Sequence, residues 1–481
     1  MTSALGAAGE VAIASLIERA PLASSLAQSF AAKGFRLALV GGPVRDALLG
    51  RLGNDLDFTT DAKPEDTKKI LQSWAENIWE IGIEYGTVAG KRGDTTVEVT
   101  TYRSESYDPE SRKPEVVYGE NIEGDLSRRD FTVNAMALEL TTKVPEFIDP
   151  FNGLEDLAKK ILRTPTKAEN SFSDDPLRMM RAARFASQLS FEIAPDVLQA
   201  IKDMAGRISI ISAERVRDEF TKILMSSHPR VGITILVETG LAEIVLPEIP
   251  KLRLEIDEHH HHKDVYEHSI TVLEQAIAHE ERLGGPNLII RLAALLHDIG
   301  KPKTRSLIAG GGVSFHHHEI VGARLTKSRL KALRFDGETI EQVETLVALH
   351  LRFHGYGDGE WTDSAVRRYV RDAGELLTHL HVLTRADCTT RNVKKAERLA
   401  AVYDSLEARI AKLMEEEELS KIRPDLDGAQ VMSLLGIKPS AAVGNALDFL
   451  LELRLENGPL GEGRATKELL DWWSKENPAA K

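Results

Sequence analysis

The spacing of apolar residues changes once along this chain, near residue 160, and this change constrains the fold more than any other feature. Before it, short alternating segments separated by glycine turns predict strands over 35–40, 55–60, 95–102 and 132–140. After it, apolar residues recur about every 3.6 positions and predict helices over 176–189, 212–225, 268–283, 288–300 and 396–418. The pattern is typical of an α+β module followed by an all-helical body.

Composition narrows the class of protein. The 481 residues leave room for about two to four domains, and 42% hydrophobic residues suffice for several cores. Because the net charge is −13, a bound polyanion must meet a local basic patch. Cys388 is the only cysteine, which excludes an internal disulfide and suits a reducing compartment. The N-terminus has no basic segment before an apolar core, and no apolar run reaches the length of a membrane span. We therefore expect a cytoplasmic protein.

The first candidate site follows the strand predicted over 35–40, where Gly41 and Gly42 lead into a helix. Glycines let a ligand approach the backbone, and the free N–H groups of a helix start favour a phosphate. A tight turn is the alternative explanation.

Carboxylates follow on two predicted strands. Asp55 and Asp57 share one face of their strand, and Glu98 faces away from the core in the segment 95–102. If the two strands are neighbours, the three carboxylates suit two Mg²⁺ ions, the usual apparatus of nucleotidyl transfer. The alternative is a solvated strand face.

A basic segment comes next. Arg128 and Arg129 are candidates for phosphate contacts, and Asp130 and Asn134 for hydrogen bonds to ribose hydroxyls. A charged strand entry explains the same residues without a ligand.

Eight motifs together carry a resemblance to a known family. They are GGPVRD, LG, DLD, VEVTTY, RRDFTVNA, DPFNGLEDL, DDPLRMMRAARF and ERVRDEF, within about residues 30–225. In order and approximate spacing they resemble the class II tRNA nucleotidyltransferase and bacterial poly(A) polymerase family. The resemblance implies a polymerase-β-like nucleotidyltransferase head, followed by an elongated all-helical neck and body.

The resemblance also implies residue roles. Asp55 and Asp57 would bind Mg²⁺, and Glu98 would assist them as the third catalytic carboxylate. The implied nucleotide-binding residues are Gly41, Gly42, Arg45, Arg129, Asp130, Asn134, Asp175, Arg178, Arg181 and Arg184.

The base-selecting pair has a physical rationale. On a helix, Asp175 and Arg178 would share a face. The carboxylate accepts from an exocyclic amino group and the guanidinium donates to a ring nitrogen, so the pair favours cytosine and adenine. Helix capping by the acids is an alternative that is compatible with this role. Asp174 stands where the family usually has Glu, which leaves the role of this first acid open.

A long polar segment, 104–126, is predicted as a loop between Glu98 and Arg128. In the resembling family a flexible loop here helps the change from C addition to A addition, and its presence favours full CCA activity. Its counterpart in this chain is placed around Glu110 and Arg112.

A second constellation lies in the helical body. Adjacent His297 and Asp298 end an apolar helix, and this segment resembles an HD-domain metal phosphohydrolase. By that resemblance one ion would be held by His268, His297, Asp298 and Asp387, and a second by His318 and His350. The implied metal is a transition-metal ion, Mn, Ni, Co or Fe, and the domain is either active or a scaffold.

Two basic stripes are candidates for tRNA contact, with solvated helix faces as the alternative. They comprise Arg324, Lys327, Arg329, Lys331 and Arg334, and Arg391, Lys394, Lys395 and Arg398. The runs His259–His262 and Glu415–Glu418 are interpreted as a linker and a solvent-facing segment.

The resulting prediction is an Mg²⁺-dependent enzyme that adds C, C and A to the 3′ end of tRNA from CTP and ATP and releases pyrophosphate. The alternatives are a poly(A) polymerase, an HD phosphohydrolase with an RNA-delivering first domain, and an RNA-binding scaffold. The predicted domains are a head over 1–160, a neck with tRNA and nucleotide binding over 161–255, an HD domain over 256–400 and a helical tail over 401–481. Oligomeric state is left open.

Overall fold

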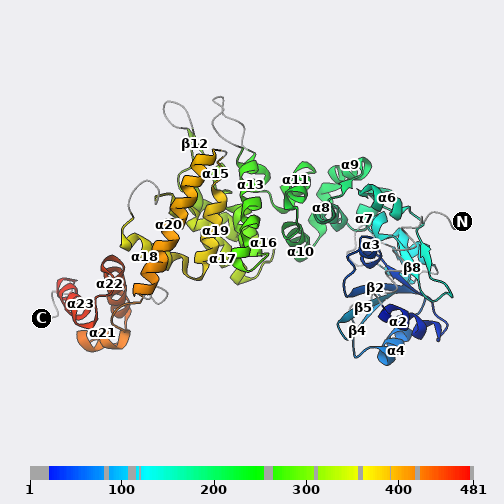
Figure 1. Ribbon diagram of the computed structural model, residues 1–481, viewed down its shortest axis with the longest axis horizontal. Coiled ribbons are helices and arrows are strands. Elements are labelled where there is room, and N and C mark those ends of the chain that lie inside the picture. The colour runs from blue at the N-terminus through cyan, green and yellow to red at the C-terminus, as the bar shows by residue number, and fades with distance from the viewer. Residues whose placement is uncertain are drawn as a thin grey trace. The chain divides into compact units, whose positions relative to one another are not determined.

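The computed structural model describes residues 21–80, 86–106, 115–118, 121–253, 264–307, 313–355, 361–390, 392–417 and 423–476. Contacts group the chain into two units, Met1–Pro247 and Glu248–Lys481. Figure 1 shows a mixed sheet in the first unit and helices almost throughout the second. The predicted α+β class with a helical body is therefore confirmed.

The first unit is built on a seven-stranded sheet of order β3-β4-β5-β2-β1-β8-β9. The strands are β1 (Leu37–Val40), β2 (Asp55–Thr60), β3 (Asn77–Trp79), β4 (Thr87–Arg92), β5 (Thr95–Thr101), β8 (Ala137–Glu139) and β9 (Glu146–Ile148). Neighbours are antiparallel except for β2 and β5, which run parallel. All four residues of β1 are buried, as expected for an apolar central strand.

Short helices complete the head around this sheet. They are α2 (Pro21–Ala31), α3 (Gly42–Leu48), α4 (Pro64–Trp74), α5 (Ile122–Ser127) and α6 (Gly153–Lys159). Pro at the start of α3 and α4 suits a first turn, where an N–H would have no partner. Trp74 on α4 donates from its indole nitrogen to Ser25 Oγ on α2 at 2.8 Å, which ties the two helices together.

Two expectations for the head need correction. The predicted strand 132–140 is a strand only over β8. Its first part, Thr132–Asn134, forms a 3-10 turn (η2) with buried side chains. The polar segment 104–126 is not all loop: it contains β7 (Glu115–Tyr118), paired with β6 (Arg103–Ser106), and most of α5, whose start is capped by Asn121. Glu110 and Arg112 lie outside the described residues.

Helices α7 (Ala168–Asp174), α8 (Leu177–Leu189), α9 (Pro195–Met204), α10 (Ala213–Leu224), α11 (Pro229–Glu238) and α12 (Leu241–Val245) complete the first unit, with 3-10 turn η3 (Ala205–Ile210). Strands β10 (Ile161–Leu162) and β11 (Glu192–Ile193) pair in parallel beside them. Helix α8 packs on α10 and α11. Gly232 on α11 allows that helix to lie close to α8, because a Cβ at this position would be only 2.3 Å from Ser187 Oγ on α8. The helices predicted over 176–189 and 212–225 are confirmed by α8 and α10.

Among the residues that the structure describes, the second unit has two strands, β12 (Ser306–Leu307) and β13 (Val313–Ser314), which pair antiparallel, and its other elements are helices and 3-10 turns. Its α-helices are α13 (Val265–Ala278), α14 (Leu288–Leu296), α15 (Lys301–Thr304), α16 (His318–Ala332), α17 (Gly337–Leu349), α18 (Asp363–Ala373), α19 (Leu377–Asp387), α20 (Val393–Glu417), α21 (Gly428–Leu435), α22 (Ala441–Asn457) and α23 (Glu462–Glu476). Its 3-10 turns are η4 (Pro250–Leu252), η5 (Glu280–Leu283), η6 (His350–Gly355) and η7 (Gly374–Leu376). The predictions over 268–283, 288–300 and 396–418 correspond to α13, α14 and α20.

Helix α14 forms the centre of the HD region. It packs against α13, α17 and α19, and from Ile290 to Leu296 every residue is buried. The acidic run predicted to face solvent does so where it is described: Glu415 and Glu416, near the end of α20, are exposed. His259–His262 lie outside the described residues. Within the described part of the chain, no helix is long and apolar enough to cross a membrane.

Candidate active site and metal centre

Three carboxylates meet where β2 and β5 run side by side. The register pairs Asp57 directly with Glu98, while Asp55 lies two residues earlier on the same face of β2. Leu56 and Phe58 point into the core between them, so the alternation leaves all three carboxylates exposed. The prediction that a neighbouring strand places Glu98 beside the aspartates is confirmed.

The electrostatics of this cluster favour a cation. Asp57 is open to the cavity, but the surrounding protein removes part of its hydrating water, and this desolvation raises its pKa to about 6; Arg129 opposes the rise, and the charges of Glu98 and Asp55 add to it. Carboxylates that repel one another hold their charge best when a cation lies between them. The oxygen-only donor set fits a hard divalent ion.

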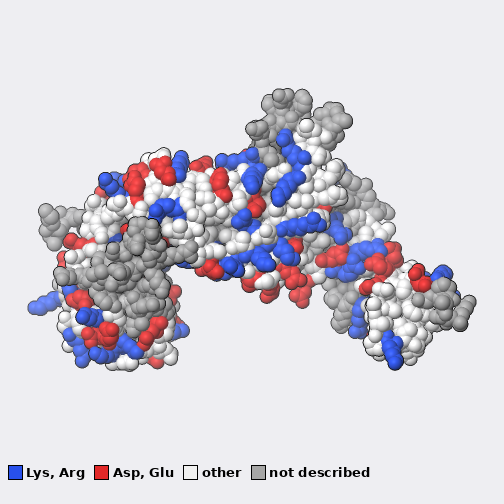
Figure 2. Space-filling view, turned by 180° about the vertical axis from the view of Figure 1, so that it is seen from behind, with Lys and Arg blue, Asp and Glu red and all other residues white. Residues whose placement is uncertain are grey.

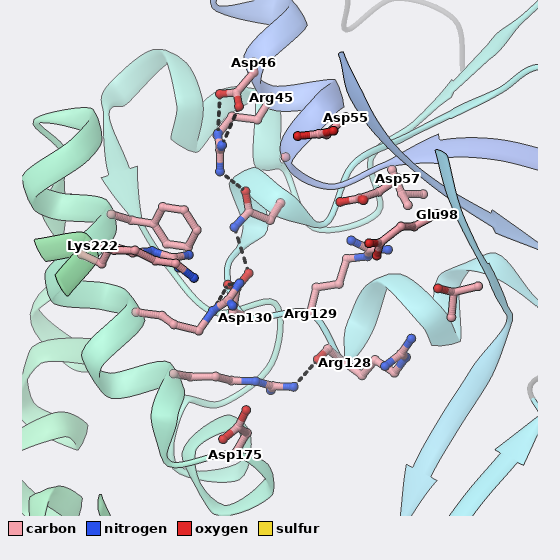
Figure 3. A pocket seen from close by; sticks show the side chains of 18 of the residues that line it. Arg45, Asp46, Asp55, Asp57, Glu98, Arg128, Arg129, Asp130, Asp175 and Lys222 are labelled. Carbon is pink, nitrogen blue, oxygen red and sulfur yellow. Dashed lines mark hydrogen bonds and ion pairs between the residues drawn. The ribbon is translucent and has the colours of Figure 1, made fainter. Parts of the chain in front are cut away.

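Arg129 approaches the carboxylates through a gap made by glycine. Gly41 has φ 74°, and a Cβ there would lie 2.5 Å from Arg129 Nη1. Any side chain at position 41 would therefore be strained and would displace the guanidinium. Figure 3 shows Arg129 extending toward Asp57 and Glu98. Arg128 instead donates to Asp125 Oδ1 at 2.7 Å, although it also lines the cavity.

One open cavity of about 1120 Å³ contains nearly all the residues predicted for nucleotidyl transfer. Only Gly41 among them is not part of its wall, because it lies behind Arg129. The lining residues are Val40, Gly42, Arg45, Asp46, Asp55, Asp57, Phe58, Thr87, Glu98, Thr100, Arg128, Arg129, Asp130, Asn134, Asp175, Arg178, Arg181, Arg184, Phe185, Gln188, Arg215 and Lys222.

The predicted helical arrangement of Asp175 and Arg178 is wrong. Asp175 ends α7 in an extended conformation with φ −140° and ψ 99°, because it precedes Pro176, which disfavours helical geometry at that position. Its Oδ1 accepts from Leu177 N at 3.1 Å and its Oδ2 accepts from Arg215 Nη2 at 2.8 Å. Both Asp175 and Arg178 still line the cavity. The cap residue of α8 is Pro176, which makes no side-chain cap hydrogen bond, so the predicted capping by acids is limited to the contact between Asp175 and Leu177 N.

Arg178 is held from two sides. Its Nη1 donates to Ser171 Oγ at 2.8 Å, and its Nη2 donates to the carbonyl of Arg128. These contacts fix the guanidinium at the wall of the cavity, with Asp175 nearby from a different segment.

Arginines surround a single aromatic ring deeper in the cavity. The guanidinium of Arg184 lies 4.2 Å from the centroid of the Phe185 ring, and those of Arg45 and Arg181 lie at 5.2 Å and 5.6 Å. Arg184 also donates to Glu219 Oε1 at 2.9 Å, and both side chains are buried. Burial lowers the pKa of Arg184 to about 10, with the charge of Arg181 acting in the same direction. The grouping forms a positive wall suited to a polyanion.

The second unit brings the predicted HD residues into two adjoining groups. One group is His268, His297 and Asp387, and the other is Asp298, His318 and His350; within each, ligand atoms lie within 4.8 Å of one another. Asp298 joins them, since its Oδ2 is 3.2 Å from His297 Nε2 and its Oδ1 is 3.2 Å from His318 Nε2. The four residues predicted for one ion lie together, since Asp298 Oδ2 is also 3.5 Å from His268 Nε2 and Asp387 Oδ1 is 2.9 Å from the same atom, while Asp298 Oδ1 faces the second group.

Outward hydrogen bonds orient these rings. His297, His318 and His350 place Nδ1 2.7–2.8 Å from the backbone carbonyls of Ala294, Phe315 and Val347. This leaves Nε2 directed inward: that of His318 faces Asp298 Oδ1 at 3.2 Å, and in the described structure the buried Nε2 of His350 has no hydrogen-bond partner. Such an arrangement is typical of metal-binding imidazoles.

The charge states also suit metal ligands. Burial lowers the pKa of His350 to about 3, which keeps its ring neutral. Burial acts to raise the pKa of Asp298, but His297, His318 and Lys301 together hold it well below its usual range. A neutral imidazole beside an ionised carboxylate is the form that binds a metal.

The basic stripes are partly paired. Arg329 donates to Glu248 at 2.8 and 3.0 Å, and Lys327 to Glu344 at 2.8 Å. Arg324 and Lys331 on α16, and Lys394, Lys395 and Arg398 on α20, are exposed. Arg391 lies outside the described residues. Figure 2 shows Lys and Arg side chains interspersed with Asp and Glu on the face in view.

Comparison with known proteins gives three family models along the chain. They are the "Poly A polymerase head domain" over residues 37–163, the "Probable RNA and SrmB- binding site of polymerase A" over 190–252, and the "HD domain" over 265–416. An A-adding tRNA nucleotidyltransferase of Deinococcus radiodurans is 32% identical over 450 residues, which cover 92% of this chain and 96% of that protein. The chain belongs to the tRNA nucleotidyltransferase family.

One further relative of this tRNA nucleotidyltransferase family member matches over a shorter stretch, and two solved structures match over nearly the whole chain. The CCA-adding enzyme of Lactobacillus helveticus is 43% identical over 213 residues, so the chain spans about half of that protein, 52%. The Bacillus stearothermophilus CCA-adding enzyme in complex with CTP matches 96% of this chain and 99% of its own, with 25% identity and a TM-score of 0.67. The Thermotoga maritima CCA-adding enzyme complexed with tRNA, at 19% identity over 95% of each chain and a TM-score of 0.59, shares the fold.

Sequence reasoning missed several cavity residues of this family member. Phe185 and Gln188 continue the face of α8 that carries Arg178, Arg181 and Arg184, so helical spacing was a signal for them. Arg215 and Lys222 are seven apart on α10 and share a face in the same way. Asp46 had no distinctive signal, because nothing in its spacing shows that it pairs with the neighbouring Arg45.

Proposed function

We propose that this protein adds C, C and A, without a nucleic-acid template, to the 3′ end of tRNA from CTP and ATP, releasing pyrophosphate. The observation that carries this is the Asp57–Glu98 register, which brings three carboxylates together in a cavity lined by arginines. The relatives named CCA-adding enzyme and the similarity to one in complex with CTP support it.

A divalent metal at the carboxylate cluster, proposed to be Mg²⁺, would neutralise charge on the reacting phosphates and lower the pKa of the attacking hydroxyl. Asp55 and Asp57 would hold it, and Glu98 would assist. These carboxylates orient the tRNA 3′-hydroxyl toward the α-phosphate. Arg45 and Arg129, with the backbone at Gly42, bind the triphosphate.

Base selection is proposed for Asp175 and Arg178, which reach one cavity from adjacent segments. Asp175 accepts from the amino group of cytosine or adenine, and Arg178 donates to a ring nitrogen. Uracil and guanine present a carbonyl where the carboxylate needs a donor, so they are rejected.

A second candidate is addition of the terminal A alone, because the relative that matches over nearly the whole length is named A-adding. Poly(A) synthesis is a third product of the same chemistry. The deciding experiment uses tRNA ending before CCA, after one C and after two C, with single and mixed nucleotides, followed by sequencing of the ends. Complete CCA supports the proposal, whereas A added only after two C, or a run of A, contradicts it.

The HD region is proposed to bind a transition-metal ion, Mn, Ni, Co or Fe, through its two histidine and aspartate groups. Bound there, the ion would polarise a phosphoester and activate water. The neutral ring of His350 and the two ionised aspartates fit this chemistry. Lys301, whose Nζ is 2.6 Å from Asp298 Oδ2, lies where it can contact a phosphate.

We also propose three further properties: a division into four domains at residues 160, 255 and 400, a cytoplasmic location, and tRNA contact by the exposed basic residues. The exposed lysines and arginines of α16 and α20 support an RNA surface only as local patches on an acidic protein.

A further inference from the structure

His268 differs from the other three histidines of the HD cluster in what its Nδ1 contacts. His297, His318 and His350 each direct Nδ1 at a backbone carbonyl. Nδ1 of His268 instead lies 3.1 Å from the hydroxyl oxygen of Thr389. A carbonyl oxygen only accepts a hydrogen bond, whereas a hydroxyl both donates and accepts. Among these four histidines, His268 is therefore the one whose outer contact fits either neutral form of the ring.

The segment that holds Thr389 also supplies a proposed metal ligand. Asp387 ends α19, and its Oδ1 lies 2.9 Å from His268 Nε2. The backbone N–H of Thr389 donates to the carbonyl of Asp387 at 2.9 Å, so the two residues form one tight turn. This turn contacts both nitrogens of the His268 ring, with the carboxylate on the inner side and the hydroxyl on the outer side.

Helix α13 contacts the same turn at a second point. Gln275 follows His268 by seven residues on α13, so the two side chains share a face of the helix. With its amide nitrogen directed at the end of α19, Gln275 donates to the carbonyls of Ala386 at 2.6 Å and Cys388 at 3.3 Å. Helices α13 and α19 also pack against each other. The position of Thr389 is thus set by contacts between two helices, and not by the imidazole alone.

The two neutral forms of His268 suit different partners at Nε2. With its proton on Nε2, the ring donates to Asp387 and accepts from the Thr389 hydroxyl at Nδ1. With its proton on Nδ1, the ring donates to Thr389 and presents the Nε2 lone pair, which is the form that binds a metal ion. At the other three histidines the carbonyl keeps a proton on Nδ1 whether or not a metal is bound.

We infer that Thr389 is a positioning residue of the HD metal centre: its hydroxyl orients the His268 ring and lets the ring change from the Nε2–H form to the metal-binding Nδ1–H form. The inference rests on the metal binding proposed for this region. The proton moves from one ring nitrogen to the other, and the hydroxyl turns from donor to acceptor, so no proton is released at His268. The group that contains His268 should depend on Thr389, and the group that contains His350 should not.

Metal affinity tests the positioning role. Calorimetry measures Ni²⁺ binding to the full chain for the parent, for Thr389→Val, which removes the hydroxyl at nearly constant shape, and for Thr389→Ser, which keeps it. Binding that persists in the double variant His297→Ala, Asp298→Ala is subtracted, because the carboxylate cluster and the run His259–His262 offer donors of their own. We expect Thr389→Val to bind the ion about 10- to 100-fold more weakly, as for other residues that orient a ligand. Thr389→Ser should stay within about threefold of the parent.

NMR of the imidazole nitrogens tests the change of tautomer. In protein that contains isotope-labelled histidine, at a pH of about 8 where an ordinary imidazole is neutral, the shifts of Nδ1 and Nε2 show which nitrogen carries the proton. Zn²⁺ is the diamagnetic probe, and His268→Gln assigns the signals of His268. We expect the proton of His268 on Nε2 without Zn²⁺ and on Nδ1 with it, whereas His318 and His350 keep a proton on Nδ1 in both states. A residue that only stabilises the fold would not produce this exchange.

Thr390→Val is the matched control, because the hydroxyl of Thr390 accepts from Asn392 N at 3.3 Å, and this variant should bind metal as the parent does. If Thr389→Val does not fold, Thr389→Ala takes its place and must show the same loss. Parent-like Ni²⁺ binding without the hydroxyl, or a proton on Nδ1 of His268 in the metal-free parent, overturns the inference alone. A parent protein that binds no ion at the HD groups contradicts the proposed metal site together with the inference.

Discussion

Asp57 and Asp130 line the same cavity, yet their carboxylates are in opposite electrostatic states. At Asp57, burial and two neighbouring carboxylates raise the pKa to about 6. At Asp130, burial acts in the same direction, but the Arg181 guanidinium and the Asn134 amide lower the pKa to about 2. One carboxylate still needs a cation, and the other already has one.

The difference in pKa between Asp57 and Asp130 distinguishes a carboxylate suited to bind a metal from one that holds neighbouring side chains in place. At the carboxylate cluster the single nearby guanidinium, that of Arg129, does not bring the pKa of Asp57 back to its usual value, so the cluster marks the end of the cavity where a metal cation would bind. The Asp130 carboxylate, already paired with a guanidinium, contributes by fixing its partners. Asp298 in the HD region combines both situations: burial acts to raise its pKa, His297, His318 and Lys301 lower it, and the buried Nε2 of His350 nearby has no hydrogen-bond partner in the described structure.

Substitution in the carboxylate cluster should have the largest effect on nucleotide addition. We expect Asp57→Ala to reduce nucleotide addition by at least about 10³-fold while the fold and tRNA binding persist, because charge stabilisation is lost mainly in the transition state. Single-turnover incorporation into tRNA measures this. Asp94→Ala, in the exposed turn between β4 and β5, is the matched control and should retain activity. Near-normal incorporation by Asp57→Ala would show that the cluster is not the catalytic centre.

Asp130 should contribute to the free energy of unfolding, and this contribution should depend on pH. Because the folded pKa of Asp130 lies below its unfolded value of 3.8, its contribution is complete above pH 4 and disappears as pH falls toward 2. The shift corresponds to about 2 kcal/mol at neutral pH. We expect Asp130→Asn to lower the free energy of unfolding by about that amount or more at pH 7, and by clearly less near pH 3.

Equilibrium urea unfolding at the two pH values measures this difference. A destabilisation that is the same at both would mean that the charge of Asp130 is not what stabilises the head.

Substitution of the proposed base-selecting residue Asp175 should have a smaller effect, limited to the choice of nucleotide. Asp175→Ala should weaken discrimination against UTP and GTP by about 1–3 kcal/mol, because the acceptor for the amino group is lost and a carbonyl is no longer repelled. Competition among the four nucleotides for a tRNA end measures it. Glu169→Ala removes an exposed acid of α7 and should leave selectivity unchanged. Unchanged preference in Asp175→Ala would assign base selection to another residue.

The HD region should have no effect on nucleotide addition. The double variant His297→Ala, Asp298→Ala should lose bound transition metal and any metal-dependent phosphatase or phosphodiesterase activity, but preserve addition to tRNA. His316→Ala, an exposed histidine beside the cluster, is the control for metal binding. A parent protein that binds no Mn²⁺, Ni²⁺ or Co²⁺ and hydrolyses no phosphoester would remove the catalytic assignment of this region.

Much of the site was predictable from local pattern. Alternation placed Asp55, Asp57 and Glu98 on exposed strand faces, whereas Arg181 and Arg184 were predicted only through the family resemblance. The extended backbone of Asp175 also had a local signal, in the proline that follows it. The prediction of a shared helical face failed because the spacing rule was applied across that proline.

The sequence by itself determined the α+β head, the helical body, the exposed faces and the order of the motifs, because periodicity and backbone preference act over a few residues. Only the tertiary structure decided that β2 and β5 are parallel neighbours, that Arg215 reaches Asp175, and that Asp298 lies between two metal-binding groups. It also decided that Asp130 pairs with Arg181. Partners in these contacts come from distant segments, and each contact depends on distances that no sequence spacing encodes.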